Sequence, residues 1–231
     1  MVELAASFDD AWTRFQARDS LRTVGDTLEW EWTQGRAQYL AFLVRVEDSA
    51  AREYLARIAQ RLESIPGIEV YPQPYWHVTI KGLGFQVIKR THENDILRQD
   101  VPRIAGKARA LLSSQSAFDV QLGLANGFAE VAFVELWDEG RAGQLNACLA
   151  EGLPGLAHSP IDGPAFLPHV SIARFTSDDG LYKLKAALAE LRAQGPGPSF
   201  AVRRVELVKA WLSEGPPDFD TLASYPLRGA R

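Results

Sequence analysis

Two nearly identical tetrapeptides constrain this chain more than any other feature. They read His-Val-Thr-Ile at residues 77–80 and His-Val-Ser-Ile at residues 169–172, a separation of 92 positions. Both are rich in β-branched residues, which is typical of strands. Because side chains alternate between the faces of a strand, each histidine shares a face with the hydroxyl residue two positions later. Each tetrapeptide therefore predicts a strand that buries Val and Ile on one face and presents an imidazole and a hydroxyl on the other.

The spacing of apolar residues predicts a similar order of elements around each tetrapeptide. In the first half we expect helices over 4–18, 49–64 and about 91–111, the last broken at Pro102, and strands over 28–32, 39–46, 68–71 and 75–81. In the second half we expect helices over 139–149 and 178–193, and strands over 118–124, 130–136, 167–175 and 202–212, followed by a tail with two prolines. Asn126-Gly127 is expected to form the turn between the first two of these strands.

We interpret this order as two successive halves of one α+β fold. The predicted architecture is a bilobal, pseudo-twofold domain in which two antiparallel sheets with outer helices enclose a central groove. Residues 21–231 would form this single domain, and residues 1–20 an N-terminal helical extension. Leu4, Phe8, Trp12 and Phe15 share one face of that extension, so we expect it to pack against the body or a partner chain.

The composition excludes several classes of protein. Cys148 is the only cysteine of 231 residues, so neither an intrachain disulfide nor a cysteine-based zinc site can form. No apolar run is long enough to cross a bilayer, and residues 1–20 lack the apolar stretch of a signal peptide. The net charge of −4 argues against a protein that coats long nucleic acids. We therefore expect a soluble, cytoplasmic monomer that contacts no membrane and binds its partner around one phosphate.

The two predicted strands suggest a common chemistry. If the lobes face each other, two imidazoles and two hydroxyls surround one small volume. A histidine with a pKa of about 6.5 can take a proton from water or a hydroxyl, while a second, protonated histidine donates one to a leaving oxygen. Hydroxyls can stabilise charge on the nonbridging oxygens. The sequence thus predicts His77, His169, Thr79 and Ser171 as catalytic residues, without deciding which histidine is the acid.

These motifs resemble the signature of the two-histidine (2H) phosphoesterase superfamily, especially its 2′,5′ RNA ligase-like and cyclic phosphodiesterase branch. Residues 77–84 (His-Val-Thr-Ile-Lys-Gly-Leu-Gly) are similar to its first motif and residues 168–174 (Pro-His-Val-Ser-Ile-Ala-Arg) to its second. Residues 205–227 look like its C-terminal strand and closing segment. The likeness covers residues 38–228, and Ser171 keeps the hydroxyl of the commoner Thr. It implies metal-free, cofactor-free cleavage or formation of phosphodiesters with 2′ linkages or 2′,3′-cyclic ends, in an RNA end or a small nucleotide.

Two neighbours of the first motif are candidate substrate-binding residues. Lys81 lies on the same strand face as His77, where it could hold a phosphate or be a solvated charge at the strand end. Tyr75 shares that face too, and could stack a base or pack in the groove wall. We expect Phe128, Trp137 and Trp211 to belong to the core rather than to a base-binding surface.

Two other hypotheses fit the same residues. The first is a non-catalytic RNA- or nucleotide-binding module of the same fold, in which the histidines only hold phosphate. The second is a two-histidine metalloenzyme, against which stands the lack of a carboxylate ligand beside either motif. Turnover of a nucleotide, measured with and without a chelator, separates the three hypotheses.

Overall fold

A computed structural model describes residues 5–24, 32–153, 156, 162–163, 166–212 and 215–229 of the chain. The strand expected over 28–32 falls outside these residues except for Trp32, and Leu4 lies outside them. The helices are α1 (Phe8–Ala17), α3 (Ser49–Glu63), α4 (Val101–Leu112), α5 (Arg141–Gly152) and α6 (Leu181–Ala193). The 3₁₀ turns are η1 (Gln73–Tyr75) and η2 (Arg98–Asp100).

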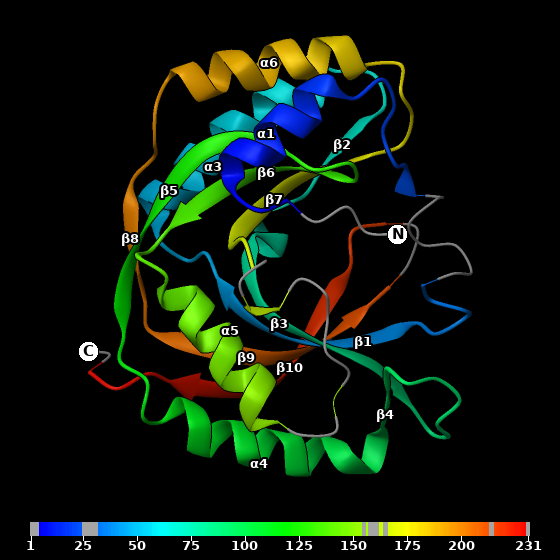
Figure 1. The fold of residues 1–231 in the computed structure, drawn as a ribbon, viewed down its shortest axis with the longest axis vertical. Helices are drawn as coiled ribbons and strands as arrows, with labels where there is room; N and C mark the ends of the chain where they lie inside the picture. The colour runs from blue at the N-terminus through cyan, green and yellow to red at the C-terminus, as the bar shows by residue number, and fades with distance from the viewer. Residues whose placement is uncertain are drawn as a thin grey trace.

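Within the described residues, ten strands form one continuous sheet whose two mainly antiparallel lobes are joined in its middle (Figure 1). The β1 lobe contains β10 (Asp218–Pro226), β9 (Arg204–Trp211), β1 (Gln38–Arg45) and β3 (His77–Val87), with the short β4 (Asp95–Leu97) parallel to β3. The β7 lobe contains β7 (His169–Phe175), β6 (Val131–Trp137), β5 (Phe118–Gly127) and β8 (Ser199–Val202), with β2 (Ile68–Val70) beside β7. The predicted α+β fold with antiparallel strands and outer helices is confirmed, but the two expected sheets are the two lobes of one continuous sheet.

The two lobes join where β3 and β7 run antiparallel. Val78 and Val170 are the residues that pair there, and both side chains are buried. Ile80 and Ile172 are buried as well, so the predicted apolar faces of the two tetrapeptides lie in the main core. The opposite faces of the same strands, which carry the histidines and hydroxyls, are turned away from that core.

The lobes are not successive halves of the chain, which corrects our interpretation of the element order. Helix α3, from the first half, packs on β2, β7 and α6 of the β7 lobe. Helix α5, from the second half, packs on β3 and α4 of the β1 lobe. Strands β9 and β10 also return from the end of the chain to pair with β1 and with each other. Each lobe is therefore assembled from both halves of the sequence.

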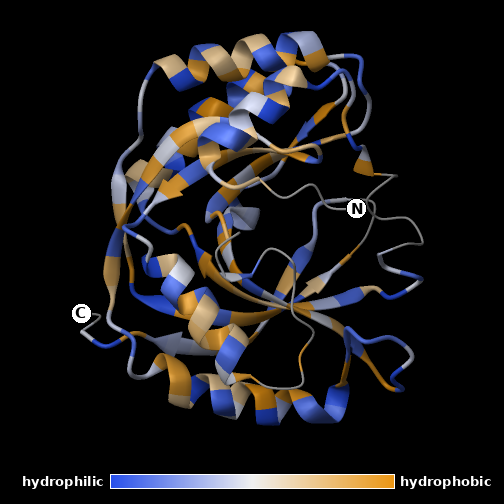
Figure 2. Ribbon diagram, viewed as in Figure 1, coloured by the Kyte–Doolittle hydropathy of each residue, from blue (hydrophilic) through white to orange (hydrophobic). Residues whose placement is uncertain are grey.

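Helix α3 shows why the helices cover the sheets on their outer side. Asp48 caps it by accepting a hydrogen bond from the Ala51 backbone N–H at 2.9 Å. Its buried residues recur at helical spacing, from Ala51 through Leu55 and Ile58 to Leu62. The other long helices likewise carry apolar and polar residues in alternating bands (Figure 2). Burial of one such band against a sheet holds each helix in place.

Four local expectations were wrong. Asn126 and Gly127 belong to β5, and the turn to β6 lies at residues 128–130. Pro102 does not break a helix, because it stands in the first turn of α4, where no backbone N–H donor is needed. The stretch 202–212 is two strands rather than one. The proline-containing tail leads into β10, an edge strand with one fully buried residue, Tyr225.

Helix α1 covers the side of the β7 lobe that carries the histidine of β7. Ser7 caps the helix, and Phe15 is almost completely buried against Gly127 of β5. Phe8 and Ala11 pack with Phe133 of β6 in a second, smaller core. Within the described ranges, no helix is long and apolar enough to cross a bilayer.

Candidate active site

The two predicted histidines are anchored in the same way. His77 Nδ1 lies 2.5 Å from the carbonyl oxygen of Tyr75, and His169 Nδ1 lies 2.8 Å from that of Leu167. In both cases the acceptor is two residues earlier in the chain. A carbonyl can only accept, so each Nδ1 carries the proton and each Nε2 of the neutral ring has a lone pair. The repeated motif thus presents the same basic atom twice.

The hydroxyl of Thr79 contacts the first histidine directly. Its Oγ1 lies 3.1 Å from His77 Nε2, so the hydroxyl donates to the neutral ring. The pairing of Val78 with Val170 puts Thr79 on the side of His169, since both residues adjoin the paired valines on the opposite face. Ser171 occupies the equivalent position on β7 and is paired across to Phe133 of β6.

Burial keeps both imidazoles neutral. It lowers the pKa of His77 to about 4, and the positive charges of Arg45 and of His169 act in the same direction. Arg45 lies beside His77 on β1 and forms an ion pair with Glu206 at 2.9 Å. Burial also lowers the pKa of His169, against the hydrogen bond to Leu167, which raises it. Because β3 and β7 pair through Val78 and Val170, the two histidines lie on the same face of neighbouring strands.

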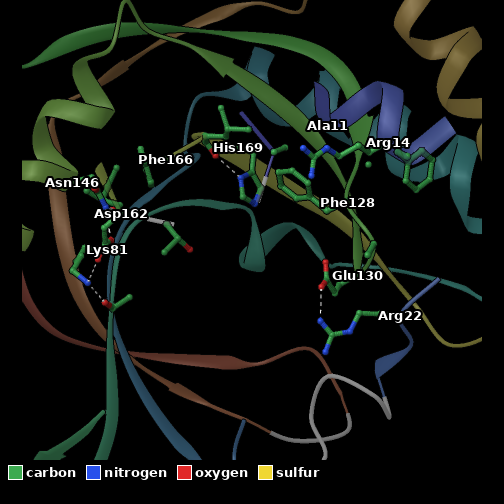
Figure 3. Close-up of a pocket in the computed structure, with 18 of the residues that line it drawn as sticks. Ala11, Arg14, Arg22, Lys81, Phe128, Glu130, Asn146, Asp162, Phe166 and His169 are labelled. Carbon is green, nitrogen blue, oxygen red and sulfur yellow. Dashed lines mark hydrogen bonds and ion pairs between the residues drawn. The ribbon is translucent and has the colours of Figure 1, made fainter. Parts of the chain in front are cut away.

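A cavity of about 260 Å³ opens beside His169 and Thr79 (Figure 3). Phe128, Phe166 and Leu167 supply much of its apolar lining. His77, Ser171 and Tyr75 are not among the described residues that line it. The structure therefore brings His169 and Thr79 to the cavity, and connects His77 to it through the Thr79 hydroxyl.

Aromatic rings flank both histidines. Tyr75 and Phe219 each lie edge-on to His77 with ring centroids 4.9 Å away. Phe128 and Phe133 surround His169 at 5.3 and 4.9 Å. Such contacts exclude water from the imidazoles and account for the lowered pKa values. Phe128 lines the cavity and also packs against Phe133 of the smaller core, so the expectation of a core residue holds in part.

Tyr75 does not belong to the strand of His77. It ends the 3₁₀ turn η1, and its ring stacks on Tyr71 with centroids 3.9 Å apart. Phe219 lies 5.4 Å from it in a tilted arrangement. Tyr75 is therefore part of a packed aromatic cluster beside His77. Trp137 and Trp211, also expected in the core, are 39% exposed.

Lys81 is neither solvated nor at the end of its strand. Its side chain is 2% exposed, and Nζ lies 2.8 Å from Asp162 Oδ2 and donates to the Gly82 carbonyl at 2.8 Å. Asn146 of α5 donates to Asp162 Oδ1 at 3.0 Å and to the Ile80 carbonyl at 2.8 Å. Figure 3 shows this group on the side of the cavity opposite Arg14. The cavity wall thus contains a fixed ammonium group whose charge is compensated by one carboxylate.

Three arginines from the N-terminal segment line the same cavity, and sequence reasoning missed them. They are Arg14, Arg18 and Arg22, at a spacing of four residues. Arg14 is held by Asp10 at 2.9 Å and Arg22 by Glu130 at 3.0 Å. The four-residue spacing was a signal in the sequence only for Arg14 and Arg18, because α1 ends at Ala17, well before Arg22. Its meaning was hidden because the segment precedes both histidine motifs.

Comparison with known proteins identifies the family. Residues 46–210, more than two thirds of the chain, match the model of the 2′-5′ RNA ligase superfamily. The chain belongs to the 2′-5′ RNA ligase superfamily. Both histidine motifs lie within the matched residues, whereas α1 and the three arginines precede them. Among curated proteins no sequence matches the chain.

Solved structures of low sequence identity share the fold of this superfamily member. TT0787 of Thermus thermophilus is 21% identical with a TM-score of 0.57, over 84% of this chain and 100% of the other. Escherichia coli LigT without ligand is 18% identical with a TM-score of 0.55, over 83% and 98% of the two chains. ATU0111 of Agrobacterium tumefaciens, described as a conserved protein of unknown function, is 14% identical with a TM-score of 0.57, over 81% and 85%.

Proposed function

We propose that this protein is a metal-independent phosphodiesterase that acts on 2′,3′-cyclic or 2′,5′-linked phosphodiesters of RNA ends or small nucleotides. The observation that carries the proposal is the matched anchoring of His77 and His169, in which each Nδ1–H donates to a backbone carbonyl and each Nε2 is the basic atom. A site that only held phosphate would not need two oriented proton acceptors. Titrating groups at matched positions suit general acid–base catalysis.

The two imidazole rings account for both proton transfers of the hydrolysis. One neutral Nε2 takes a proton from the attacking water as its oxygen bonds to phosphorus. The other Nε2, protonated, donates its proton to the leaving oxygen as the bond from phosphorus breaks. The Thr79 hydroxyl lies where it can donate to a nonbridging oxygen once a phosphate displaces it from His77. After turnover the two histidines have exchanged protonation states.

We assign His77 as the base and His169 as the acid. Arg45 lies beside His77 on the neighbouring strand, and the Thr79 hydroxyl donates to its Nε2, so both contacts favour a neutral ring. Burial lowers the pKa of both rings, to about 4 for His77, where the positive charge of Arg45 acts in the same direction. A single proton on the coupled pair would therefore reside mainly on His169.

Ligands of a related protein are consistent with a nucleotide substrate. Escherichia coli LigT, which shares the fold, has been crystallised with 3′-AMP, phosphate, ATP and NADP⁺. Phosphate and 3′-AMP resemble parts of a cleaved cyclic or 2′,5′-linked nucleotide. By this comparison the substrate of the present protein would be a phosphodiester of a nucleotide.

The proposal is tested with purified protein and two substrates, 2′,3′-cyclic AMP and a 2′,5′-linked adenosine dinucleotide, each with and without EDTA. We expect turnover of at least one substrate, unchanged by EDTA. His77→Ala and His169→Ala should each lower kcat/KM by roughly 10²–10⁴-fold, and Thr79→Ala and Ser171→Ala by about 10–10³-fold. His92→Ala, at a histidine outside both motifs, is the matched control and should leave turnover unchanged.

Three outcomes would contradict the proposal. Abolition of turnover by EDTA with rescue by a divalent cation would favour a metalloenzyme. Full activity of His77→Ala and His169→Ala would place the active site elsewhere. Tight binding of 3′-AMP without turnover of either substrate would favour the non-catalytic nucleotide-binding module.

A further inference from the structure

The N-terminal segment forms one wall of the cavity that contains His169. Ala5, Ala11, Arg14, Phe15, Arg18 and Arg22 all line it. The segment is fixed to the body, because Phe15 is 1% exposed and the Arg22 backbone N–H donates to the Ala129 carbonyl at 2.8 Å. The N-terminal segment is thus a fixed part of the cavity wall, although it lies outside residues 46–210, which match the superfamily model.

This wall makes the cavity basic in a chain that is acidic overall. Among the described lining residues four are lysine or arginine and two are aspartate or glutamate, with Asp10 as a third carboxylate beside Arg14, so positive groups still outnumber negative ones in a chain of net charge −4. Arg14 and Arg18 each direct Nε to a nearby oxygen, of Asp10 at 2.9 Å and of the Ser20 carbonyl at 3.1 Å. Anchoring by Nε restricts the plane of each guanidinium group. A guanidinium group held in this way matches the oxygens of a phosphate in geometry and charge.

The cavity combines this basic wall with apolar surface. Phe128, Phe166 and Leu167 line it, and Figure 3 shows Phe128 near Arg14 and Phe166 near Asp162. The volume of about 260 Å³ is close to the lower limit of roughly 300 Å³ for small-molecule pockets. His169, the proposed proton donor, lies at one end of the cavity, and the arginines lie at the other end. A ligand that spans both ends needs an apolar ring and two anionic groups.

We infer that Arg14 and Arg18 form a second phosphate subsite, so that the preferred substrate is a phosphodiester carrying a further phosphate in addition to the scissile one. The kinetic test of this inference rests on the proposed function, because it requires turnover by His77 and His169. A free nucleotide and the next linkage of an RNA end are two sources of that second phosphate, because both present the same anionic oxygens. The subsite gives the N-terminal extension a role in substrate selection.

The kinetic test compares three substrates with the same cyclic end. They are 2′,3′-cyclic AMP, the same nucleotide with a 5′-phosphate, and a dinucleotide that ends in the cyclic phosphate. We expect kcat/KM to be at least 10-fold higher for the second or third than for the first. In the double variant Arg14→Gln/Arg18→Gln the ratio should fall toward 1. Arg61→Gln, at an exposed arginine of α3, should keep the wild-type ratio.

The three substrates also distinguish the sources of the second phosphate. Preference for the 5′-phosphorylated mononucleotide indicates a free nucleotide, and preference for the dinucleotide indicates an RNA end. Equal kcat/KM for all three substrates in the wild-type protein, or an unchanged preference in a folded Arg14→Gln/Arg18→Gln variant, would overturn the inference. Melting temperatures of the variants show whether they are folded.

A binding measurement makes the inference testable without turnover. Calorimetry compares adenosine 3′,5′-bisphosphate with 3′-AMP, neither of which contains a diester. The bisphosphate should bind at least 10-fold more tightly to the wild-type protein and with similar affinity to 3′-AMP in Arg14→Gln/Arg18→Gln. If turnover is absent but this difference is found, the proposed hydrolysis fails and the subsite stands. If turnover requires both histidines but the two ligands bind equally, the subsite fails alone.

Discussion

His77 and His169 have the same anchor but different neighbours, and this difference can be measured at the level of single residues. Each ring donates from Nδ1 to the carbonyl two positions earlier. His77 has an arginine beside it on the next strand and a hydroxyl bonded to Nε2, whereas His169 is paired across to Glu135 of β6. These contacts underlie the assignment of His77 as base and His169 as acid.

The assignment predicts opposite responses to the leaving group. A nitrophenolate leaves without being protonated, so a nucleoside nitrophenyl phosphate does not need the general acid. His169→Ala should therefore lose much less kcat/KM on that substrate than on 2′,3′-cyclic AMP, by a factor of about 10². His77→Ala should lose about the same on both. The reverse pattern in parallel assays would exchange the two roles.

The pKa of His77 also predicts how stability depends on pH. The folded value is about 4 and the unfolded value about 6.5, so between these pH values the unfolded chain binds a proton that the folded chain does not. Stability should therefore decrease as pH falls from 6.5 to 4, by an amount on the order of 1–3 kcal/mol from this residue. In His77→Gln this contribution disappears. Urea unfolding of both proteins at pH 7 and pH 5 measures it, and parallel losses of stability would contradict it.

The repeated tetrapeptides predicted the faces of β3 and β7 because a strand has a strict period of two. Val78 and Val170 are buried, and the histidines lie on the other face. The pairing of Lys81 with Asp162 was not predictable, because it joins residues that are distant in sequence. The approach of Arg14 to the cavity of His169 was equally hidden, since nothing local relates α1 to β7.

At the level of elements, α1 is held to the body because the Phe15 ring packs closely against strand β5 at Gly127. A Cβ built on Gly127 of β5 would lie 2.5 Å from the Phe15 ring. Gly127 is thus required by packing. This contact, together with the neighbouring aromatic cluster, fixes the arginine wall relative to His169.

Gly127→Ala should consequently displace α1. We expect a loss of about 1–3 kcal/mol, the usual cost of overpacking, together with a weaker preference for doubly phosphorylated ligands. Gly106→Ala on α4 is the matched control, because nothing lies within 4 Å of its added Cβ and alanine favours a helix by up to about 1 kcal/mol. Thermal unfolding of the two variants compares them. Equal melting temperatures would show that α1 is not pressed against β5.

Several elements were misread from sequence for physical reasons. Strand β10 is an edge strand with few buried side chains, so its apolar alternation is weak. Asn126-Gly127 has the composition of a hairpin turn, but Asn126 is buried and donates to Glu135 at 2.8 Å, which holds it in β5. In both cases contacts with distant residues, rather than the local sequence pattern, determine the secondary structure.

At the scale of the whole molecule, each lobe contains segments from both halves of the chain. Helix α3 and strand β2 belong to the β7 lobe, while α5, β9 and β10 belong to the β1 lobe. We therefore predict that residues 1–112 and 113–231, expressed separately, do not fold. The intact protein should unfold in one transition, which coincident circular dichroism and fluorescence curves would show. Two separated transitions would contradict this.

The same exchange of segments has a consequence during synthesis on the ribosome. Strand β1 emerges early, but its neighbour β9 ends at Trp211, so the apolar residues of β1 lack one flanking strand until nearly the whole chain has been translated. The β7 lobe is likewise incomplete until α6 and β8 have been synthesised. Nascent chains shorter than about 210 residues should therefore be digested rapidly by protease, and resistance should appear only when β9 has left the exit tunnel.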